Sequence, residues 1–248
     1  MASLLLALLA VPAVAAGPGY ADLSGGSFRS AIRFEENGGN VEVPAFSMMT
    51  RAVTRAQFQQ FLQQHPQWRR DRVPTLFADG NYLSAWSAPE QPGADGDAPV
   101  TQVSWYAADA YCKAQGARLP TWLEWEYAAA ADAERADARS DPAWRQRVLL
   151  DGTPHAVDAG AGARPNVHGV AGLHGTAWEW VEDFSSLMDG AEKRGGADGE
   201  KLQFCGAGAL QFNDRGNYTV LKRIAILSAM RPANTLGNLG FRCARSLP

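Results

Sequence analysis

Two sequences with the spacing of a capping box indicate that this chain contains short helices with well-marked starts. In the first, the Thr54 hydroxyl and the Gln57 amide can satisfy unpaired N–H groups of the first turn, and Pro66 ends the apolar helical spacing that follows. In the second, Thr121 and Glu124 stand at the same spacing. Because such helices are short, the rest of the core is expected to come from loops and strands.

The rest of the chain fits an irregular α+β domain with aromatic side chains in its core. Its 25 glycines and eight tryptophans accompany few long helical patterns. Ser104 is expected to cap a further helix that Gly116 ends. Short strands are predicted at Ser27–Phe34, Val41–Phe46, Trp178–Val181, Phe204–Ala209 and Phe241–Ala244. The stretches 89–99 and 189–201 are predicted surface loops, so one domain over residues 22–248 is the simplest organisation.

Composition excludes several classes of function. The chain has 23 Lys and Arg against 26 Asp and Glu, a net charge of −3, so it has no cationic excess and no nucleic-acid partner is expected. Its three cysteines include no C-x-x-C, which argues against a zinc ribbon or a thioredoxin-like site. No G-x-S-x-G, Walker loop or H-E-x-x-H occurs, so hydrolase and nucleotide-binding functions lack a site.

The N-terminal apolar run at residues 4–16 is too short to span a bilayer of about 30 Å as a helix. It ends in small residues, and cleavage near Ala15 or Ala21 fits a secretory signal peptide. No Lys or Arg precedes Arg29, which departs from that pattern and keeps a buried helix or a retained membrane anchor as alternatives. We predict that residues 1–21 are a signal peptide and that the mature chain is periplasmic or secreted, with no membrane association after cleavage.

Four segments in a fixed order resemble one known family. They are GGSF at Gly25–Phe28, the run Pro99–Ala131, PNVHGVAGLHGTAWEW at Pro165–Trp180 and NLGFRCAR at Asn238–Arg245. Together they resemble the formylglycine-generating enzyme, or sulfatase-modifying factor, domain family. The segment His65–Trp86 is most similar to an exported branch associated with nitrite reductase, and a pyoverdine-maturation protein is another exported relative. The resemblance implies the formylglycine-generating-enzyme fold, a C-type-lectin-related α+β domain with little regular secondary structure.

The family's best-known reaction needs residues that this sequence lacks. The resemblance implies two active-site cysteines that bind Cu(I), and Gln211 stands where the first is expected. We therefore predict that the chain does not generate formylglycine. Cys205, at the edge of the same segment, and Gln211 remain the catalytic candidates, with copper or iron as the metal. Cys205 is otherwise a free thiol, an intermolecular bridge or a buried apolar residue.

The other two cysteines match positions that form a disulfide in some members of the family. The resemblance therefore implies a bond between Cys112 and Cys243, which would join the second predicted helix to the last predicted strand. Two separate buried thiols are the alternative.

The resemblance also implies a calcium site. Gly175 and Ala177 match positions that supply backbone carbonyls, and Glu179 matches a carboxylate ligand, all oxygen donors suited to a hard cation. Gly172 and Thr176 replace residues whose side chains the family conserves there, so the predicted site has lost at least one ligand. Without an ion, Glu179 is expected to accept hydrogen bonds from N–H groups of the loop.

Three histidines, His155, His168 and His174, lie close together in the sequence. Their spacings fit neither a helical nor a strand pair of metal ligands, and we expect structural or surface roles for them.

Polar residues after the altered cysteine segment form a predicted binding groove. They are Asn213, Asp214, Arg215, Tyr218 and Arg223. Such side chains could bind a peptide, a peptide-like siderophore precursor or a loop of a partner protein, and a solvated hairpin is the alternative.

These observations predict an exported accessory or maturation factor for a periplasmic enzyme, such as nitrite reductase, or for a peptide product. A metal-dependent oxidoreductase acting on a small or peptidic substrate is the second hypothesis, and a ligand-binding module is the third. The sequence sets neither the substrate nor the oligomeric state.

Overall fold

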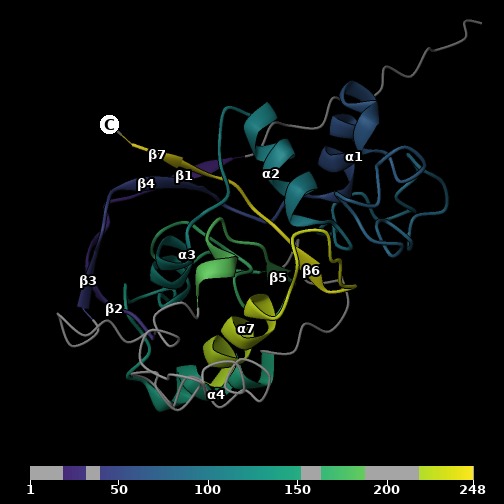
Figure 1. Ribbon diagram of the computed structural model, residues 1–248. Helices are drawn as coiled ribbons and strands as arrows, with labels where there is room; N and C mark the ends of the chain where they lie inside the picture. Colours follow the sequence, from purple (N-terminus) through teal and green to yellow (C-terminus); the bar gives the residue numbers. More distant parts are fainter. Residues whose placement is uncertain (1–18, 32–39, 152–162, 188–217, 248) are drawn as a thin grey trace, which may run out of the picture.

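The two ends of the described chain meet in a three-stranded antiparallel sheet. The computed structural model describes residues 19–31, 40–151, 163–187 and 218–247. Strands β1 (Tyr20–Leu23) and β7 (Ala244–Ser246) pair with opposite edges of β4 (Phe46–Met49), as Figure 1 shows. All four residues of β4 are buried, because this central strand is covered on both faces.

Two further sheets have two strands each. Strand β2 (Gly26–Arg29) pairs antiparallel with β3 (Asn40–Val43), and β5 (Trp178–Glu179) pairs in parallel with β6 (Leu239–Gly240). Gly240 is required by this packing, since a Cβ atom there would lie 2.4 Å from the Val100 carbonyl oxygen. The C-terminal part of the chain is thereby pressed against the loop before the second helix.

The three predicted helices are confirmed, together with the chemistry that starts them. They are α1 (Arg55–Gln64), α2 (Trp105–Ala114) and α3 (Trp122–Ala129). Both capping boxes form in full, with the Thr54 and Thr121 hydroxyl groups accepting hydrogen bonds from the third helical residue. The Ser104 hydroxyl caps α2 by accepting from the Ala107 N–H at 3.2 Å. Two single turns of 3₁₀ helix, Pro66–Trp68 and Phe184–Ser186, complete this part of the chain.

Two further helices, α4 and α7, were not predicted. Helix α4 (Pro142–Asp151) begins after Asp141, whose carboxylate accepts a hydrogen bond from the Ala143 N–H at 2.8 Å. Helix α7 (Tyr218–Ser228) buries an apolar face. That face consists of Val220, Leu221, Ile224 and Leu227. The hairpin alternative for the residues from Tyr218 onward is therefore wrong, because their apolar side chains recur at helical spacing.

Several strand predictions need new bounds. Val41–Phe46 is interrupted after Val43, where Pro44 has no N–H for a ladder. Of the predicted strand Phe241–Ala244, only Ala244 lies in a strand. The carbonyl groups of Phe241 and Cys243 accept hydrogen bonds from the N–H groups of Val53 and Met49, but these bonds are not part of a strand ladder. The strand at Trp178–Val181 is confirmed for its first two residues, and Ser27–Phe34 for residues 27–29. Phe204–Ala209 lies outside the described residues.

The core is filled by aromatic side chains, as expected. The Phe58 ring contacts four others, and three tryptophans are among the largest fully buried side chains. A disulfide between Cys112 and Cys243 crosses this core and confirms the predicted pair. It closes a loop over a sequence separation of 131, which the chain-entropy model values at about 4–5 kcal/mol.

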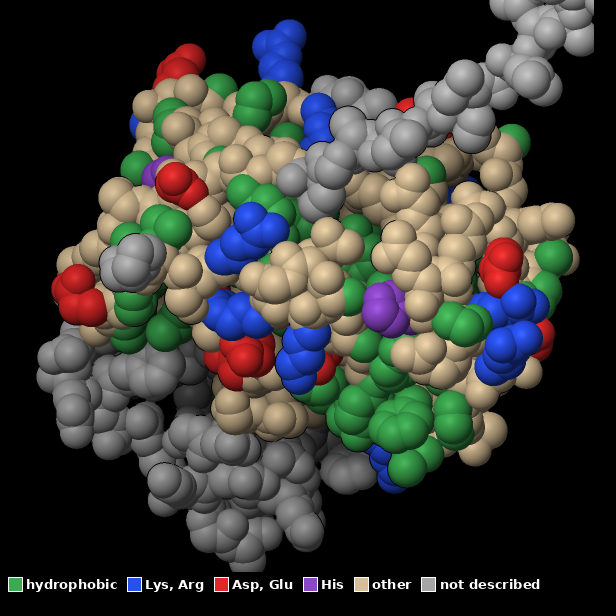
Figure 2. Space-filling view, turned by 90° about the horizontal axis from the view of Figure 1, so that it is seen from above, with side chains coloured by type: hydrophobic (Ala, Val, Ile, Leu, Met, Phe, Trp, Pro, Cys, Tyr) green, Lys and Arg blue, Asp and Glu red, His purple; other side chains and the backbone are tan. Residues whose placement is uncertain are grey.

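Helices α1 and α2 lie at one end of the molecule and α4 and α7 at the other, with α3 and the β5–β6 pair between them (Figure 1). Within the described ranges, no helix combines the length and the apolar character needed to cross a membrane. On the face shown in Figure 2, basic and acidic side chains are interspersed.

Candidate functional site

The structure describes only part of the predicted site. Five predicted residues lie outside the described ranges. They are Cys205, Gln211, Asn213, Asp214 and Arg215. Tyr218 is the first residue of α7, and Arg223 lies one turn further along it. Arg223 and Glu179, which were predicted for two different sites, meet in one buried cluster. We call Glu179, Arg242, Arg223 and Trp125 the Glu179 centre.

The carboxylate of Glu179 is bound by Arg242 in a bidentate pair. Nη2 of Arg242 lies 2.8 Å from Oε1 of Glu179, and Nε lies 2.9 Å from Oε2. Both side chains are fully buried. Trp125, from α3, donates its indole N–H to Oε2 at 3.0 Å. Both carboxylate oxygens therefore accept hydrogen bonds from protein groups.

Arg242 also joins separate segments of the backbone. Its Nη1 donates to the Met49 carbonyl at 3.1 Å and its Nη2 to the Ala171 carbonyl at 3.0 Å. Strand β4, the loop 163–174 and strand β5 are thereby fixed to the segment before β7. A buried ion pair with its remaining donors satisfied is costly to break, because a lone buried charge is left behind.

These contacts bear on the expected calcium ligands. Thr176 Oγ1 donates to the Gly172 carbonyl at 2.5 Å, and a Cβ atom on Gly172 would lie 3.2 Å from the Thr176 side chain. The two residues that depart from the family pattern therefore contact each other. With both oxygens of Glu179 already used, the residues as they lie do not fit a calcium site built on that carboxylate. Calcium bound to the carbonyls of Gly175 and Ala177 stays a prediction.

Arg223 is the second cation of the Glu179 centre. Its guanidinium lies 3.6 Å from the centre of the Trp125 ring, and its Nη2 donates to the backbone carbonyl of Glu179. Nε has no hydrogen-bond partner among the described residues. Burial is the main cause that lowers the pKa of Arg223 to about 9; the charge of Glu179 opposes this shift and the charge of Arg242 adds to it. Of the predicted groove residues, Arg223 is therefore an interior residue rather than a solvated one.

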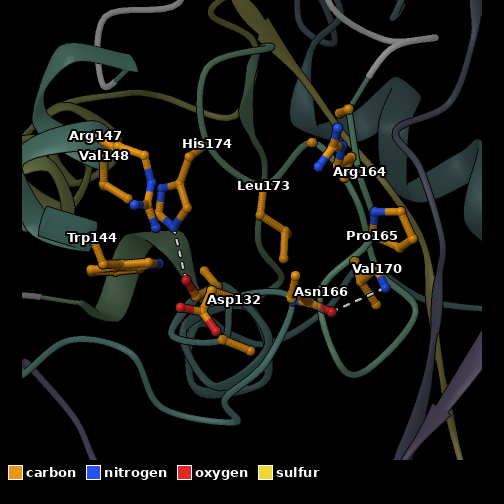
Figure 3. A pocket seen from close by; sticks show the side chains of 15 residues that line it. Asp132, Trp144, Arg147, Val148, Arg164, Pro165, Asn166, Val170, Leu173 and His174 are labelled. Atoms are coloured by element: carbon orange, nitrogen blue, oxygen red, sulfur yellow. Dashed lines mark hydrogen bonds between the residues drawn. The ribbon is translucent and has the colours of Figure 1, made fainter. Parts of the chain in front are cut away.

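The sequence did not predict a cavity of about 240 Å³, whose lining side chains are drawn in Figure 3; one of them, His174, contacts Trp125 of the Glu179 centre. Its walls come from Ala129 at the end of α3 and residues 131–133 after it, from Trp144, Arg147 and Val148 on α4, and from parts of the segment 163–174. These segments are distant in the sequence. The only local signal was the Asp-Pro pair at 141–142, which is typical of a helix start.

His174 connects the cavity with the Glu179 centre. Its Nε2 donates to the Ala129 carbonyl at 2.8 Å, and its ring makes edge contacts with Trp125 at 6.0 Å and Trp144 at 5.6 Å between ring centres. His168 stacks on Tyr127, whereas His155 lies outside the described residues. Within the described part of the chain, no three His, Cys, Asp or Glu residues are grouped to hold a metal.

Comparison with known proteins gives relatives of similar sequence. A formylglycine-generating enzyme of Streptomyces coelicolor is 34% identical over 183 residues, covering 64% of this chain and 57% of the relative. An inactive C-alpha-formylglycine-generating enzyme 2 of Mus musculus is 30% identical over 178 residues, covering 65% and 54%. A hercynine oxygenase of Mycolicibacterium smegmatis is 30% identical over 164 residues, covering 57% and 38%. The chain thus spans about half the length, or less, of these curated relatives.

A solved structure and a family model extend the match to nearly the whole chain. PvdO from Pseudomonas aeruginosa has a TM-score of 0.51 at 19% identity, covering 93% of this chain and 95% of PvdO, which supports the fold alone. The model of the sulfatase-modifying factor enzyme 1-like domain matches residues 10–247. The chain therefore belongs to the sulfatase-modifying factor family and has the α+β fold of the formylglycine-generating enzymes.

Proposed function

We propose that this chain is an exported accessory or maturation protein of its family and not a generator of formylglycine. The observation that carries the proposal is the use of its cysteines. Of three cysteines, Cys112 and Cys243 are joined in a disulfide, which leaves 3 − 2 = 1 thiol, that of Cys205. One thiol cannot supply the pair of thiolates that binds Cu(I) in the formylglycine reaction, and Gln211 stands where the first of them is expected.

A relative's name supports the idea that the fold persists without the reaction. The mouse relative is named an inactive formylglycine-generating enzyme, at 30% identity over a similar part of the chain. The proposed partner is a periplasmic protein or peptide. The residues expected to contact it, Asn213, Asp214 and Arg215, are separated from the start of α7 by two residues. Helix α7 is fixed by buried contacts, so it gives such a segment a rigid support.

Export rests on the N-terminal apolar run, and the position of β1 favours one of the two cleavage positions. Tyr20 and Ala21 pair with Met49 and Met48 in the three-stranded sheet. Cleavage near Ala21 would remove these pairs, whereas cleavage near Ala15 keeps them. Mass spectrometry of the protein recovered from the periplasm tests this choice, and a mature chain that begins after Ala21 would contradict it.

The main test measures formylglycine formation directly. The purified mature chain is incubated with Cu(I), oxygen and a cysteine-containing sulfatase peptide, with the Streptomyces coelicolor relative as positive control. We expect no aldehyde product by mass spectrometry from this chain and full conversion by the control. Conversion by this chain would overturn the proposal.

The accessory role needs its own measurement. Purified nitrite reductase is the first partner to test, by calorimetry with the mature chain, against the variant in which Asn213, Asp214 and Arg215 are replaced by alanine. Binding that the triple variant loses supports the proposed role. Equal binding by both chains would place the contact elsewhere.

A metal-dependent oxidoreductase is the second candidate, favoured by the single remaining thiol and by the similarity to a hercynine oxygenase. In this case Cys205 would ligate copper or iron. Metal analysis of the mature chain and of Cys205→Ser separates the two candidates. A stoichiometric copper or iron that is lost in the variant supports the oxidoreductase. Metal-free protein supports the accessory role.

A further inference from the structure

The cavity beside α4 combines an apolar floor with cationic groups at its rim. Trp144, Val148 and Leu173 are buried side chains of the floor, whereas Arg147 and Arg164 are exposed (Figure 3). Arg147 comes from α4 and Arg164 from the loop that forms the opposite wall. Ligand pockets commonly combine a largely apolar lining with a few polar groups that fix orientation.

The charges of the rim have no partner among the residues that the structure describes. Within the described ranges, Arg147 and Arg164 form no ion pair or hydrogen bond through their side chains. The cavity lining contains one described carboxylate, that of Asp132, which lies 2.5 Å from Nη2 of Arg135 and also accepts from backbone N–H groups. The hydrogen bond from Arg135 lowers the pKa of Asp132 to about 2, so this pair is formed at neutral pH. An anion at either of these walls therefore meets a guanidinium group that no described carboxylate neutralises.

The floor is held in shape before any ligand arrives. The His174 ring is fixed by its hydrogen bond to Ala129, and it meets the Trp144 ring edge-to-face, with the planes at 88°. Trp144 and Val148 pack with Ala138 in a small buried cluster of their own. A preformed apolar wall lowers the entropic cost of binding.

We propose that this cavity binds a carboxylate carried on an apolar or aromatic group, with the apolar body against Trp144 and the carboxylate facing Arg147 and Arg164. The volume of about 240 Å³ is below that of pockets for drug-sized ligands, about 300–1,000 Å³, so the body is the size of one amino-acid side chain. A free small acid and a peptide ending in an apolar residue share this chemistry. The inference does not depend on the accessory role proposed above.

Paired probes of equal shape and different charge test the proposal. Phenylacetate and phenylacetamide are titrated into the mature chain by calorimetry, as are the peptide Gly-Gly-Phe and its C-terminal amide. We expect each acid to bind about tenfold or more tightly than its amide, since charge-assisted hydrogen bonds are stronger than neutral ones. Tighter binding of the peptide than of phenylacetate identifies a peptide C-terminus as the source, and the reverse identifies a free acid.

Variants of the rim connect the binding to the named residues. Arg147→Gln and Arg164→Gln are each expected to weaken phenylacetate binding about fivefold or more. Arg145→Gln is the matched control, because Arg145 lies on the same helix and does not line the cavity. Both rim side chains are exposed, so the variants should fold, which their melting temperatures check.

Three results would overturn the proposal. They are equal affinity for each acid and its amide, unchanged affinity in both rim variants, and no heat of binding for any probe up to about 10 mM, the range in which weak small-molecule affinities remain measurable.

Discussion

The Glu179 centre and the cavity beside α4 both contain arginines, and the surroundings of those arginines differ. Arg242 is fully buried and donates to a carboxylate and to two backbone carbonyls. Arg147 is exposed and has no partner among the described residues. The ring of His174 contacts one tryptophan of each region, so the two are neighbours. A buried ion pair is costly to break, whereas charges left open at a rim are available to a ligand.

Removing the buried cation of the pair should have the largest effect on stability. In Arg242→Met the Glu179 carboxylate loses its counter-charge inside the core. We expect the free energy of unfolding to fall by about 3–5 kcal/mol, measured by urea denaturation. Lys113→Met, which breaks a helix-surface pair with Asp109 whose lysine is exposed, is the control and should cost about 1 kcal/mol or less. Similar losses in the two variants would show that the Glu179 centre is not closed to water.

Arg223 should behave differently from Arg242, although both are buried in the same centre. It has no carboxylate hydrogen-bond partner among the described residues, so Arg223→Met removes a buried charge without leaving another unpaired. We expect the free energy of unfolding at neutral pH to change by about 1 kcal/mol or less. A loss as large as that of Arg242→Met would contradict this view of the centre.

The same variant has a pH dependence with a definite sign. Because the folded-state pKa of Arg223 is lowered to about 9 from 12.5, the unfolded chain binds more protons between these values. Wild-type stability should therefore rise relative to Arg223→Met as the pH increases above about 9. Urea denaturation of both proteins at neutral pH and at about pH 10 measures their free energies of unfolding. The difference between wild type and Arg223→Met should shift in favour of the wild type at the higher pH.

Metal removal tests whether the Glu179 centre is complete without an ion. Since Arg242 and Trp125 use both oxygens of Glu179, a chelator should change the melting temperature by about 1 °C or less. A larger decrease that calcium alone restores would mean that an ion contributes to this region, through the carbonyls of Gly175 and Ala177 or by displacing Arg242.

The smallest effect on stability is expected at the cavity rim. Arg147→Gln and Arg164→Gln should each change the free energy of unfolding by about 0.5 kcal/mol or less, because exposed side chains without partners contribute little. Thermal denaturation measures this. A clear loss of stability would show that the rim arginines are structural, and would remove the contrast with Arg242.

Features fixed by neighbouring residues were predictable from the sequence. Both capping boxes place donor and acceptor three residues apart, so Thr54 and Thr121 start their helices as expected. The bond between Cys112 and Cys243 came from the family resemblance, since nothing local relates residues separated by 131 positions.

Features assembled from distant segments could not be predicted in the same way. Glu179 and Arg242 are 63 residues apart, and nothing in the local pattern of either shows that they form a pair. The cavity has walls from three segments, and the apolar and charged residues of its helix α4 are mixed without a clear apolar face, which hides the burial of Trp144. Arg223 was misplaced because a cation in a polar stretch indicates solvent, whereas the apolar neighbours on α7 carry it into the core.

The pairing of both ends of the described chain with β4 has a consequence for the order of events during biogenesis. One edge of β4 pairs with residues near position 20 and the other with residues near position 245. The disulfide of Cys112 likewise cannot form until Cys243 has been synthesised. Such distant contacts form slowly, because the intervening loop must close first. A chain of this topology is thus expected to remain open until its last strand has left the ribosome, a state that an export channel for unfolded polypeptides can accept. Protease digestion of nascent chains stalled before residue 239 checks this, and protection equal to that of the full chain would contradict it.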